Sequence, residues 1–406
     1  MSTFQPPVRG ATTFIVATIL IDAIGFGIVI PVLPRLIMEI GHLSVAEATR
    51  TGGWLAAVYA VTQFLCGPMA GNLGDHFGRR PVILLSLAGL AVDYVLMGFA
   101  PTLAWLFIGR SIAGVFGASF SPATAALADI TAPEDRARRF GLVGASFGIG
   151  FIIGPAVGGL LGDFGHRVPF YAAAACSAAN FLFGLFCFPE TLPVERRRRF
   201  SFARANPVGA LLAARKLRGV LGLAGILLLW NIASMVYPST WAYFAIIQYG
   251  WSNGLIGTSL ALAGISMVFV QVKLLGPTVK RLGERRAAMI GTGVAACGYL
   301  LYALVPYAWF GMILIVVTAL QALVQPSLSA LMSQRAPADA QGEMQGVIGS
   351  LNAVGAIVAP LLLNPLLAWF TGPSAPIYFP GAAFVVASGF ALLAMLSLAW
   401  VRGVIR

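Results

Sequence analysis

The chain alternates between long apolar stretches and short polar or Gly/Pro-rich turns. A helix needs roughly 20 mainly apolar residues to cross a bilayer, and the stretches are of about that length. Six of them precede a polar break and six follow it: Phe14–Ile37, Trp54–Asn72, Val82–Phe99, Leu103–Ala126, Phe140–Leu161, Phe170–Phe188, Val220–Ile247, Leu255–Leu275, Ala287–Val305, Ala308–Met332, Gln345–Phe370 and Ile377–Val401. The pattern predicts twelve membrane-spanning helices.

The composition supports this interpretation. Of the 406 residues, 59% are hydrophobic and only 10% are charged, with a mean hydropathy of +0.87. Soluble domains carry about 25% charged residues. A water-soluble enzyme, a secreted module and a nucleic-acid binder are therefore excluded, and we expect an all-α polytopic membrane protein.

The positive charges predict the orientation in the membrane. All but five of the 26 lysines and arginines fall on one side of the predicted spans; the exceptions are Arg35, Arg50 and Arg167 on the other side, and Arg110 and Lys273 within or at the edge of a span. Lys and Arg accumulate in cytoplasmic loops. We therefore expect both termini and the central break to be cytoplasmic, and the net charge of +12 reflects topology rather than a nucleic-acid partner.

The two halves of the chain resemble each other. Gly71-Asn-Leu-Gly-Asp-His-Phe-Gly78-Arg-Arg80 recurs 205 residues later as Gly276-Pro-Thr-Val-Lys-Arg-Leu-Gly283-Glu-Arg285. Parallel repeats of this kind form one of the transporter architectures, with a substrate site near the bilayer midplane. We expect a six-helix bundle over residues 1–188, a basic cytoplasmic linker over 189–218, which includes Arg196–Arg199, and a second six-helix bundle over 219–406.

Two acids stand out because they lie well inside predicted spans, Asp22 and Asp93. An ionised carboxylate inside a bilayer is costly, so burial favours the protonated form, and these residues are candidate proton carriers. The alternative is a structural acid that hydrogen-bonds across helices. Arg110 is the one arginine deep in a span; it either tunes these acids or only neutralises them.

Further candidates are glycines and polar or aromatic residues. Gly150, Gly154, Pro155, Gly158 and Gly159 in the fifth predicted span form a small-residue face that allows close helix packing. Residues that could contact a substrate, or form helix–helix hydrogen bonds instead, are Phe26, Tyr59, Gln63, Asn231, Gln271, Gln321, Gln325 and Asn352. Trp230, Tyr237 and Trp241 could line a cavity or form an interfacial belt.

Enzyme motifs are absent from the sequence. There is no Gly-Lys pair and hence no P-loop, no His-Glu-x-x-His and no paired-Cys motif. We expect no enzymatic activity, no bound metal and no cofactor, with a proton gradient as the driving force. A metal–drug chelate stays open as the form of the substrate.

The loop Gly71-x-Leu-x-Asp75-x-x-Gly78-Arg79-Arg80 resembles the signature loop of the major facilitator superfamily. The glycine pattern of the fifth span is similar to that of its drug–proton antiporters. Ile21-Asp22-Ala-Ile-Gly25-Phe-Gly27, with Pro31 and Pro34, and Val92-Asp93-Tyr94 resemble the tetracycline/proton antiporters in particular.

This resemblance implies twelve helices in two pseudo-symmetric bundles that alternate between inward-open and outward-open states. It implies a cytoplasmic gate formed by Asp75 and Arg79 with Asp129, in which Gly78 and Arg80 belong to the signature loop. It also implies that Arg110 is linked to proton transfer, and that Asp22, Gln63, Asp93 and Gln271 occupy positions for drug or proton handling.

The sequence departs from the tetracycline carriers at two substrate positions. The acid of their ninth helix aligns with Ala295, and the histidine of their eighth helix aligns with Met267. The leading hypothesis is therefore a bacterial inner-membrane antiporter for tetracycline-like or other amphipathic drugs. The alternative is a proton-linked carrier of a small metabolite. We expect a monomer whose partners are the substrate, protons and the lipid bilayer.

Overall fold

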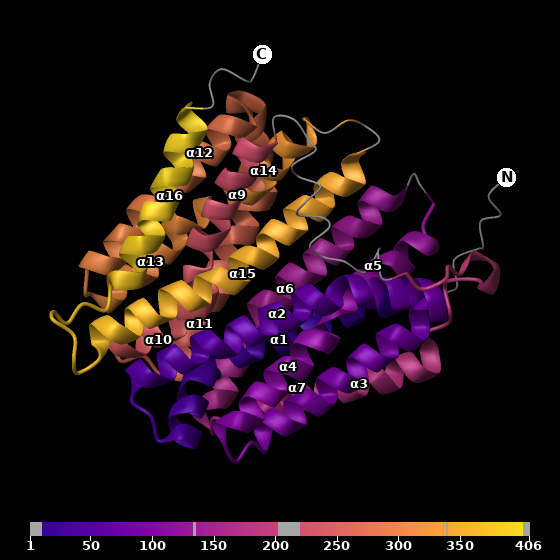
Figure 1. Ribbon diagram of the computed structural model, residues 1–406, viewed down its shortest axis with the longest axis horizontal. Helices are drawn as coiled ribbons and strands as arrows, with labels where there is room; N and C mark the ends of the chain where they lie inside the picture. The colour runs from indigo at the N-terminus through magenta and orange to yellow at the C-terminus, as the bar shows by residue number, and fades with distance from the viewer. Residues whose placement is uncertain (1–9, 133–134, 202–219, 336, 338–339, 401–406) are drawn as a thin grey trace. The chain divides into compact units, whose positions relative to one another are not determined.

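The computed structural model of the chain describes residues 10–132, 135–201, 220–335, 337 and 340–400. Regular structure within these residues is helical, without a strand (Figure 1). A helix satisfies its backbone hydrogen bonds within one segment, which the bilayer interior requires. The predicted all-α fold class is confirmed for this part of the chain.

The N-terminal half forms long helices joined by short turns. Their bounds are α1 Ala11–Gly41, α2 Val45–Phe77, α3 Arg79–Gly98, α4 Leu103–Phe116, η1 Gly117–Ser119, α5 Phe120–Asp129, α6 Arg136–Asp163, α7 Val168–Cys187 and η3 Val194–Arg196. Between α2 and α3 the chain turns at Gly78, whose φ of 107° is a conformation that favours glycine. The signature loop is therefore a one-residue break between two helices.

The C-terminal half is built in the same way. Its helices are α9 Leu221–Ser234, α10 Val236–Tyr249, α11 Asn253–Phe269, the π-helical turn η4 Val270–Leu274, α12 Leu275–Leu304, α13 Ala308–Thr318, η5 Ala319–Leu323, α14 Val324–Ser333, α15 Gln341–Thr371 and α16 Ala382–Trp400. Several spans are thus interrupted by a 3₁₀ or π turn instead of being uniform α-helices.

Helices α2 and α16 start five or more residues from the positions predicted by the apolar pattern. Helix α2 begins at Val45 instead of Trp54, because Ser44 and Glu47 form a capping box: Ser44 N donates to Glu47 Oε2 at 2.9 Å, and Glu47 N donates to Ser44 Oγ at 3.3 Å. Helix α16 begins at Ala382 instead of Ile377, since the ring of Pro380 disfavours a helical conformation for the residue before it, Phe379.

Eleven helices of the described residues are long and apolar enough to cross a membrane. One of them, Asn253–Leu304, has 52 residues. As one continuous helix, at 1.5 Å per residue, it would be about 78 Å long, more than twice the hydrocarbon core of roughly 30 Å. It contains the predicted segments 255–275 and 287–305, and Gly283 between them is non-helical, with φ 79° and ψ 161°.

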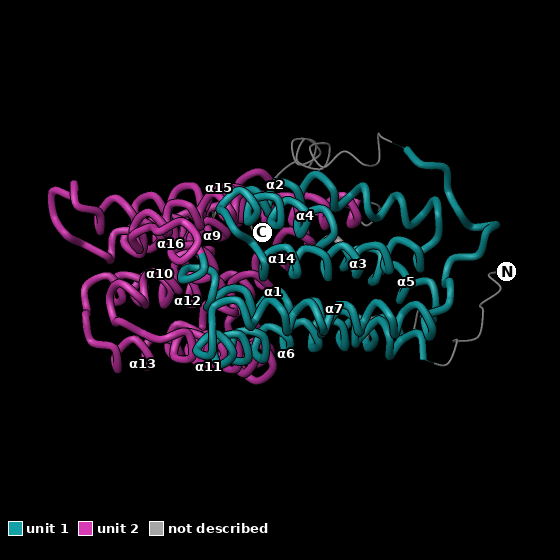
Figure 2. Tube along the Cα trace, turned by 90° about the horizontal axis from the view of Figure 1, so that it is seen from below, with its two compact units in different colours: residues 1–36, 58–207 teal, residues 37–57, 208–406 magenta. Residues whose placement is uncertain are grey.

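The chain divides into two compact units (Figure 2). Unit 1 comprises residues 1–36 and 58–207, and unit 2 comprises residues 37–57 and 208–406. The predicted linker 189–218 is described up to Ser201, and its remainder lies outside the described residues. Within unit 2, Asn364 Nδ2 on α15 donates to the carbonyl oxygens of Thr49 on α2, at 3.1 Å, and Ser239 on α10, at 3.2 Å.

The glycines of α6 bring its backbone against that of α1 inside unit 1. A Cβ added at Gly150 would lie 2.6 Å from the carbonyl oxygen of Leu20, and one at Gly154 would lie 2.5 Å from that of Ile24. A Cβ at Gly158 would overlap Ile28. Pro155 and Gly159 are also buried. Close packing of α6 fixes the segment of α1 that carries Asp22.

We expect Gly154→Ala to destabilise the protein, because the new methyl group would meet the backbone of α1, which cannot give way. Gly144→Ala is a matched control on the same helix, where a Cβ would meet no atom within 4 Å. Both substitutions gain helix propensity equally, up to about 1 kcal/mol, whereas overpacking costs about 1–3 kcal/mol. Thermal unfolding in detergent should give a lower Tm for Gly154→Ala; equal Tm values would contradict the close packing.

Candidate functional site

Asp22 on α1 faces η1, the turn that interrupts the fourth candidate span. Its Oδ2 atom accepts a hydrogen bond from Ser119 Oγ at 2.5 Å. Its Oδ1 atom is buried and has no hydrogen-bond partner among the described residues. Buried polar atoms without a partner are rare in folded proteins, so this oxygen is a place where a proton or a ligand atom can bind.

A buried ion pair joins α3 to α4 in the same unit. Arg110 Nη2 lies 3.0 Å from Asp93 Oδ2, and Asp93 is completely buried. The guanidinium also donates to the sulfur of Met97 and lies over the ring of Tyr59, 5.7 Å from its centroid. Gly109 makes room for the pair, since a Cβ there would lie 2.8 Å from Asp93 Oδ1.

Polar contacts connect the ion pair to the neighbourhood of Asp22. The hydroxyl of Tyr59, whose ring contacts Arg110, accepts a hydrogen bond from Gln63 Nε2 at 3.0 Å. The same Nε2 atom donates to the carbonyl oxygen of Gly117 at 3.3 Å. Gly117 begins η1, and Ser119, which binds Asp22, ends it. A short 3₁₀ segment within a longer helix often marks a functional hinge.

The two acids lie at different depths of their spans. Asp22 precedes the middle of α1 (Ala11–Gly41) by about four residues, roughly 6 Å along a helix, and Asp93 follows the middle of α3 (Arg79–Gly98) by about the same distance. Helices α1 and α3 are separated by one antiparallel helix and run in the same direction. The contacts from Asp93 to Asp22 therefore pass across the middle of the bilayer-spanning region.

Aromatic rings cover this path. The ring of Phe26 lies 5.9 Å from that of Tyr59 and 6.3 Å from that of Phe151, and Phe151 stacks with Phe147 at 6.4 Å. Sequence reasoning selected Phe26 and Tyr59 but missed the two phenylalanines of α6. Their spacing of four residues, which places them on one helix face, is the signal that could have identified them.

Two of the polar residues selected in the second half meet through a third. Asn231 Nδ2 on α9 donates to Asn352 Oδ1 on α15 at 2.8 Å, and Gln325 Nε2 on α14 donates to the same oxygen at 3.1 Å. We call Asn231, Gln325 and Asn352 the amide cluster. Its three helices all belong to unit 2.

The other selected polar residues of unit 2 are not hydrogen-bonded to the amide cluster. Gln321 is buried on η5, and its Oε1 atom accepts a hydrogen bond from the Tyr299 hydroxyl at 2.5 Å. Gln271 is exposed on the π-helical turn η4. Turns of this type are frequent at functional sites; the Gln271 side chain has no hydrogen-bond partner among the described residues, and its role stays a prediction.

Of the three aromatic residues whose role the sequence left open, Trp230 and Trp241 are in the core of unit 2, and Tyr237 is half-buried beside Trp241. Trp241 is 1% exposed and Trp230 is 3% exposed. The ring of Tyr237 lies 5.5 Å from that of Trp241, and its hydroxyl is hydrogen-bonded to Thr318 Oγ1 at 2.9 Å. Buried aromatic groups with satisfied polar atoms are typical of a packed core.

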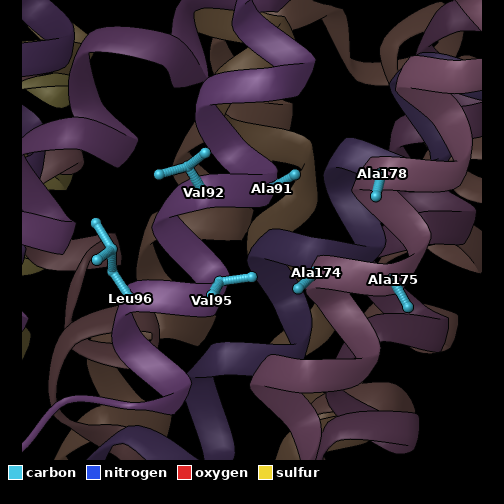
Figure 3. Close-up of a pocket in the computed structure, with 7 residues that line it drawn as sticks. All are labelled: Ala91, Val92, Val95, Leu96, Ala174, Ala175 and Ala178. Carbon is cyan, nitrogen blue, oxygen red and sulfur yellow. The ribbon is translucent and has the colours of Figure 1, made fainter.

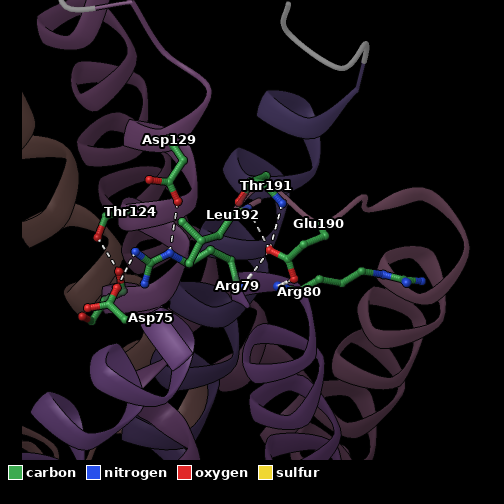
Figure 4. A network of polar contacts seen from close by, with 9 residues as sticks. Asp75, Arg79, Arg80, Thr124, Asp129, Glu190, Thr191 and Leu192 are labelled. Atoms are coloured by element: carbon green, nitrogen blue, oxygen red, sulfur yellow. Dashed lines mark hydrogen bonds and ion pairs between the residues drawn. The ribbon is translucent and has the colours of Figure 1, made fainter. Parts of the chain in front are cut away.

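Charged residues gather at the turn between α2 and α3 (Figure 4). Arg79 Nη2 lies 2.6 Å from Asp75 Oδ1, and Arg79 Nε lies 3.1 Å from Asp129 Oδ2 at the end of α5. One guanidinium therefore joins the ends of three helices of unit 1. These are the three residues that the resemblance placed together.

Sequence reasoning missed Glu190, which follows α7 and caps the start of α3. Its carboxylate accepts the backbone N–H groups of Arg79 at 2.9 Å and Arg80 at 3.3 Å (Figure 4). It also accepts those of Thr191 and Leu192, both at 2.9 Å. The first N–H groups of a helix lack intrahelical partners and attract negative charge. Glu190 and Arg79 are more than a hundred residues apart in the sequence, so no local sequence pattern predicts the contact.

Arg80 and Arg285 occupy equivalent positions in the repeated motif, but their side chains have different partners. Arg80 Nη2 donates to the carbonyl oxygen of Leu185 at 2.6 Å, outside the charge cluster. In the second half Arg285 donates to the carbonyl oxygens of Leu398, at 2.7 and 2.9 Å, and Ala399, at 2.8 Å. The two copies of the motif are thus alike in sequence but tie different groups together.

A pocket between α3 and α7 has no polar lining (Figure 3). Its lining residues are all aliphatic: Ala91, Val92, Val95, Leu96, Ala174, Ala175 and Ala178. It presents no hydrogen-bonding side chain to a polar substrate and contains none of the predicted site residues. Among the described residues, no group of three or more His, Cys, Asp or Glu side chains could hold a metal ion.

Comparisons with known proteins agree with this architecture. A family model described as Major Facilitator Superfamily matches residues 15–360. Tetracycline resistance protein, class C, of Escherichia coli is 38% identical over 375 residues, which cover 90% of this chain and 94% of that protein. Multidrug resistance protein 2 of Bacillus subtilis is 29% identical over 389 residues, which cover 94% of this chain and 95% of that protein.

A solved structure shows the same fold. The crystal structure of the human organic anion transporter MFSD10 (TETRAN) matches with a TM-score of 0.69 at 25% identity, covering 97% of this chain and 100% of that chain. The chain is thus a multi-pass membrane protein that belongs to the major facilitator superfamily and is similar, over most of its length, to tetracycline and multidrug resistance proteins.

Proposed function

We propose that this protein is a proton-coupled antiporter that exports tetracycline-like or other amphipathic drugs by alternating access. The names of the similar proteins support a drug as the substrate. The observation that carries the proposal is the series of contacts that leads from the Asp93–Arg110 pair to Asp22. The Oδ1 atom of Asp22 is buried and has no hydrogen-bond partner among the described residues. A transporter, not an enzyme, fits these features.

The proposed topology has twelve spans in two six-helix bundles. The segment Asn253–Leu304 would cross the membrane twice and turn at Gly283, where the helix is broken. Positive charge at Arg196–Arg199 and in the equivalent loops supports a cytoplasmic location of both termini, in a bacterial inner membrane. The chain would act as a monomer.

In this proposal Asp22 is the proton carrier. Its buried Oδ1 atom would take the proton, while the Ser119 hydroxyl holds Oδ2 in place. Arg110 is always charged, and Asp93 alone neutralises it with a salt bridge among the described residues. The membrane potential would supply about 2.3 kcal/mol per charge per 100 mV.

The charge cluster at the cytoplasmic end would act as a conformational gate. Arg79 holds Asp75 and Asp129 together, and Glu190 fixes the start of α3 that carries Arg79. Separating the ends of α2, α3 and α5 would require these ion pairs to break. Asp75 and Asp129 are partly exposed, but the Arg79 side chain is only 9% exposed, so separating the pairs would require water or another acid to take their place beside Arg79.

A proton-linked carrier of a small metabolite is the second candidate. The amide cluster favours it, because three carboxamides suit the hydrogen-bonding groups of a small polar metabolite as well as those of a drug. The two candidates differ in what triggers proton movement, so the same vesicle assay separates them.

In everted vesicles energised by respiration, addition of an exported drug should release protons from the acidified interior. We expect Asp22→Asn to abolish this signal, since the amide cannot carry the proton. Asp135→Asn, which changes an exposed acid, should behave like the wild type. A pH-sensitive dye reports the outcome for a drug panel that includes tetracycline with magnesium. Full activity of Asp22→Asn would refute its role, and a wild-type response to nutrients alone would favour the metabolite carrier.

Comparing a single with a double variant separates a tuning role of Arg110 from simple neutralisation. Asp93→Asn should destabilise the protein, because removing one partner of a buried ion pair costs about 3–5 kcal/mol. The double variant Asp93→Asn/Arg110→Gln should recover much of the lost Tm, yet it should not recover drug-triggered proton release. Recovery of both the Tm and proton release would show that Arg110 and Asp93 only neutralise each other and that Arg110 has no tuning role.

A further inference from the structure

The amide cluster of unit 2 joins side chains from three separate helices. It draws one residue from each of α9, α14 and α15, and both bonds end on the same atom, Asn352 Oδ1. Gly355, less than one turn from Asn352 along α15, packs against Asn231, since a Cβ there would lie 2.6 Å from Asn231 Cβ. A side chain at that position would push α9 and α15 apart and separate the amides.

The cluster retains unused hydrogen-bonding groups. A carboxamide has two N–H donors and a carbonyl oxygen that can accept two bonds. Asn352 Oδ1 already accepts two, while the Asn352 amide nitrogen makes no hydrogen bond with the described residues. Asn352 and Gln325 are half-buried, in contrast to the fully enclosed pair of Gln321 and Tyr299. The cluster can therefore still bind polar atoms of a ligand.

Its position suits a transported ligand. Asn231, Gln325 and Asn352 each lie about four residues, or roughly 6 Å along a helix, from the middle of the spans Leu221–Tyr249, Ala308–Ser333 and Gln341–Thr371. Substrate sites of transporters built from repeats lie near the bilayer midplane. All three offsets are toward the same membrane side, because α9 and α15 run antiparallel to α14.

The described part of unit 2 beyond residue 57 has only two carboxylates that could bind a divalent cation. Mg²⁺ is usually bound through carboxylates, phosphates and water. Ala295 is completely buried, and Met267 packs against the apolar cluster of Val270, Ala319, Ala322 and Leu323. The acids of the described part of unit 2 beyond residue 57 are Glu284, which directly follows the helix break at Gly283, and Glu343, in the first turn of α15. Within this part of unit 2, the amide cluster therefore offers a drug uncharged hydrogen-bonding groups.

We propose that Asn352, with Asn231 and Gln325, binds the metal-free form of the drug through its uncharged hydrogen-bonding groups, such as carboxamides, phenols and ketones. This inference rests on the proposed drug transport and narrows its substrate class. Asn352 is the residue that determines specificity, because its amide joins the other two and keeps its own N–H groups available.

Tetracycline binding to the purified full-length protein tests this assignment, with Kd measured by drug fluorescence in EDTA and in Mg²⁺. The wild type should bind tetracycline in EDTA at least as tightly as in Mg²⁺. Asn352→Leu should raise the Kd in EDTA about tenfold, equivalent to about 1.4 kcal/mol. Gln345→Leu, which changes an exposed amide two turns earlier on α15, should leave it unchanged.

Asn352→Asp provides a readout that a merely structural role would not move. Its carboxylate should shift the preference toward magnesium–tetracycline, because Mg²⁺ prefers carboxylate oxygen over amide oxygen. Gln325→Met provides a second loss of one amide if Asn352→Leu does not elute as a folded protein. It should also raise the Kd in EDTA.

Two results would overturn the inference: a wild type that binds tetracycline only with Mg²⁺, or amide variants that bind as the wild type does. Neither result depends on proton coupling. If the vesicles show drug-triggered proton release while the amide variants bind normally, the inference alone fails. If the amide variants lose binding but no drug moves protons in wild-type vesicles, the proposed function alone fails.

Discussion

The cost of placing charge in hydrocarbon governs the candidate site. Three charged groups lie well inside the spans of unit 1: Asp22, Asp93 and Arg110. Asp93 and Arg110 neutralise each other at 3.0 Å, which leaves Asp22 with a serine hydroxyl and no cation among the described residues. A carboxylate in that position is most easily neutralised by a proton. The proposed role of Asp22 as the proton carrier follows from this difference, since Asp93 has a cationic partner and Asp22 has none among the described residues.

Helix packing and helix interruptions make the arrangement possible. The glycines of α6 hold α1 in place, and Gly109 gives Asp93 room beside Arg110. The turn η1 presents Gly117 to Gln63 and Ser119 to Asp22 within three residues. In unit 2, Gly355 allows α15 to pack closely against Asn231 and so keeps the amides of the cluster within hydrogen-bonding distance. Small residues and short irregular turns thus decide where the few polar groups meet.

Much of this could be predicted from the sequence, because charges and breaks are conspicuous in an apolar chain. The helical fold, Asp22, Asp93 and Arg110 as site candidates and the glycine face of α6 all came from local patterns. Pairing did not: the sequence could not show that Arg110 pairs with Asp93, or that Ser119 contacts Asp22, since each needs the packing of distant helices. Glu190 was missed for the same reason.

Proton release on drug binding tests the central claim most directly. The purified protein, in weakly buffered detergent solution with a pH indicator, would be titrated with tetracycline in EDTA. Exchange at Asp22 predicts that binding acidifies the solution, and that Asp22→Asn binds the drug without acidification. Binding by the wild type with no change of pH, across the range in which the vesicles transport, would contradict proton-coupled exchange at this site.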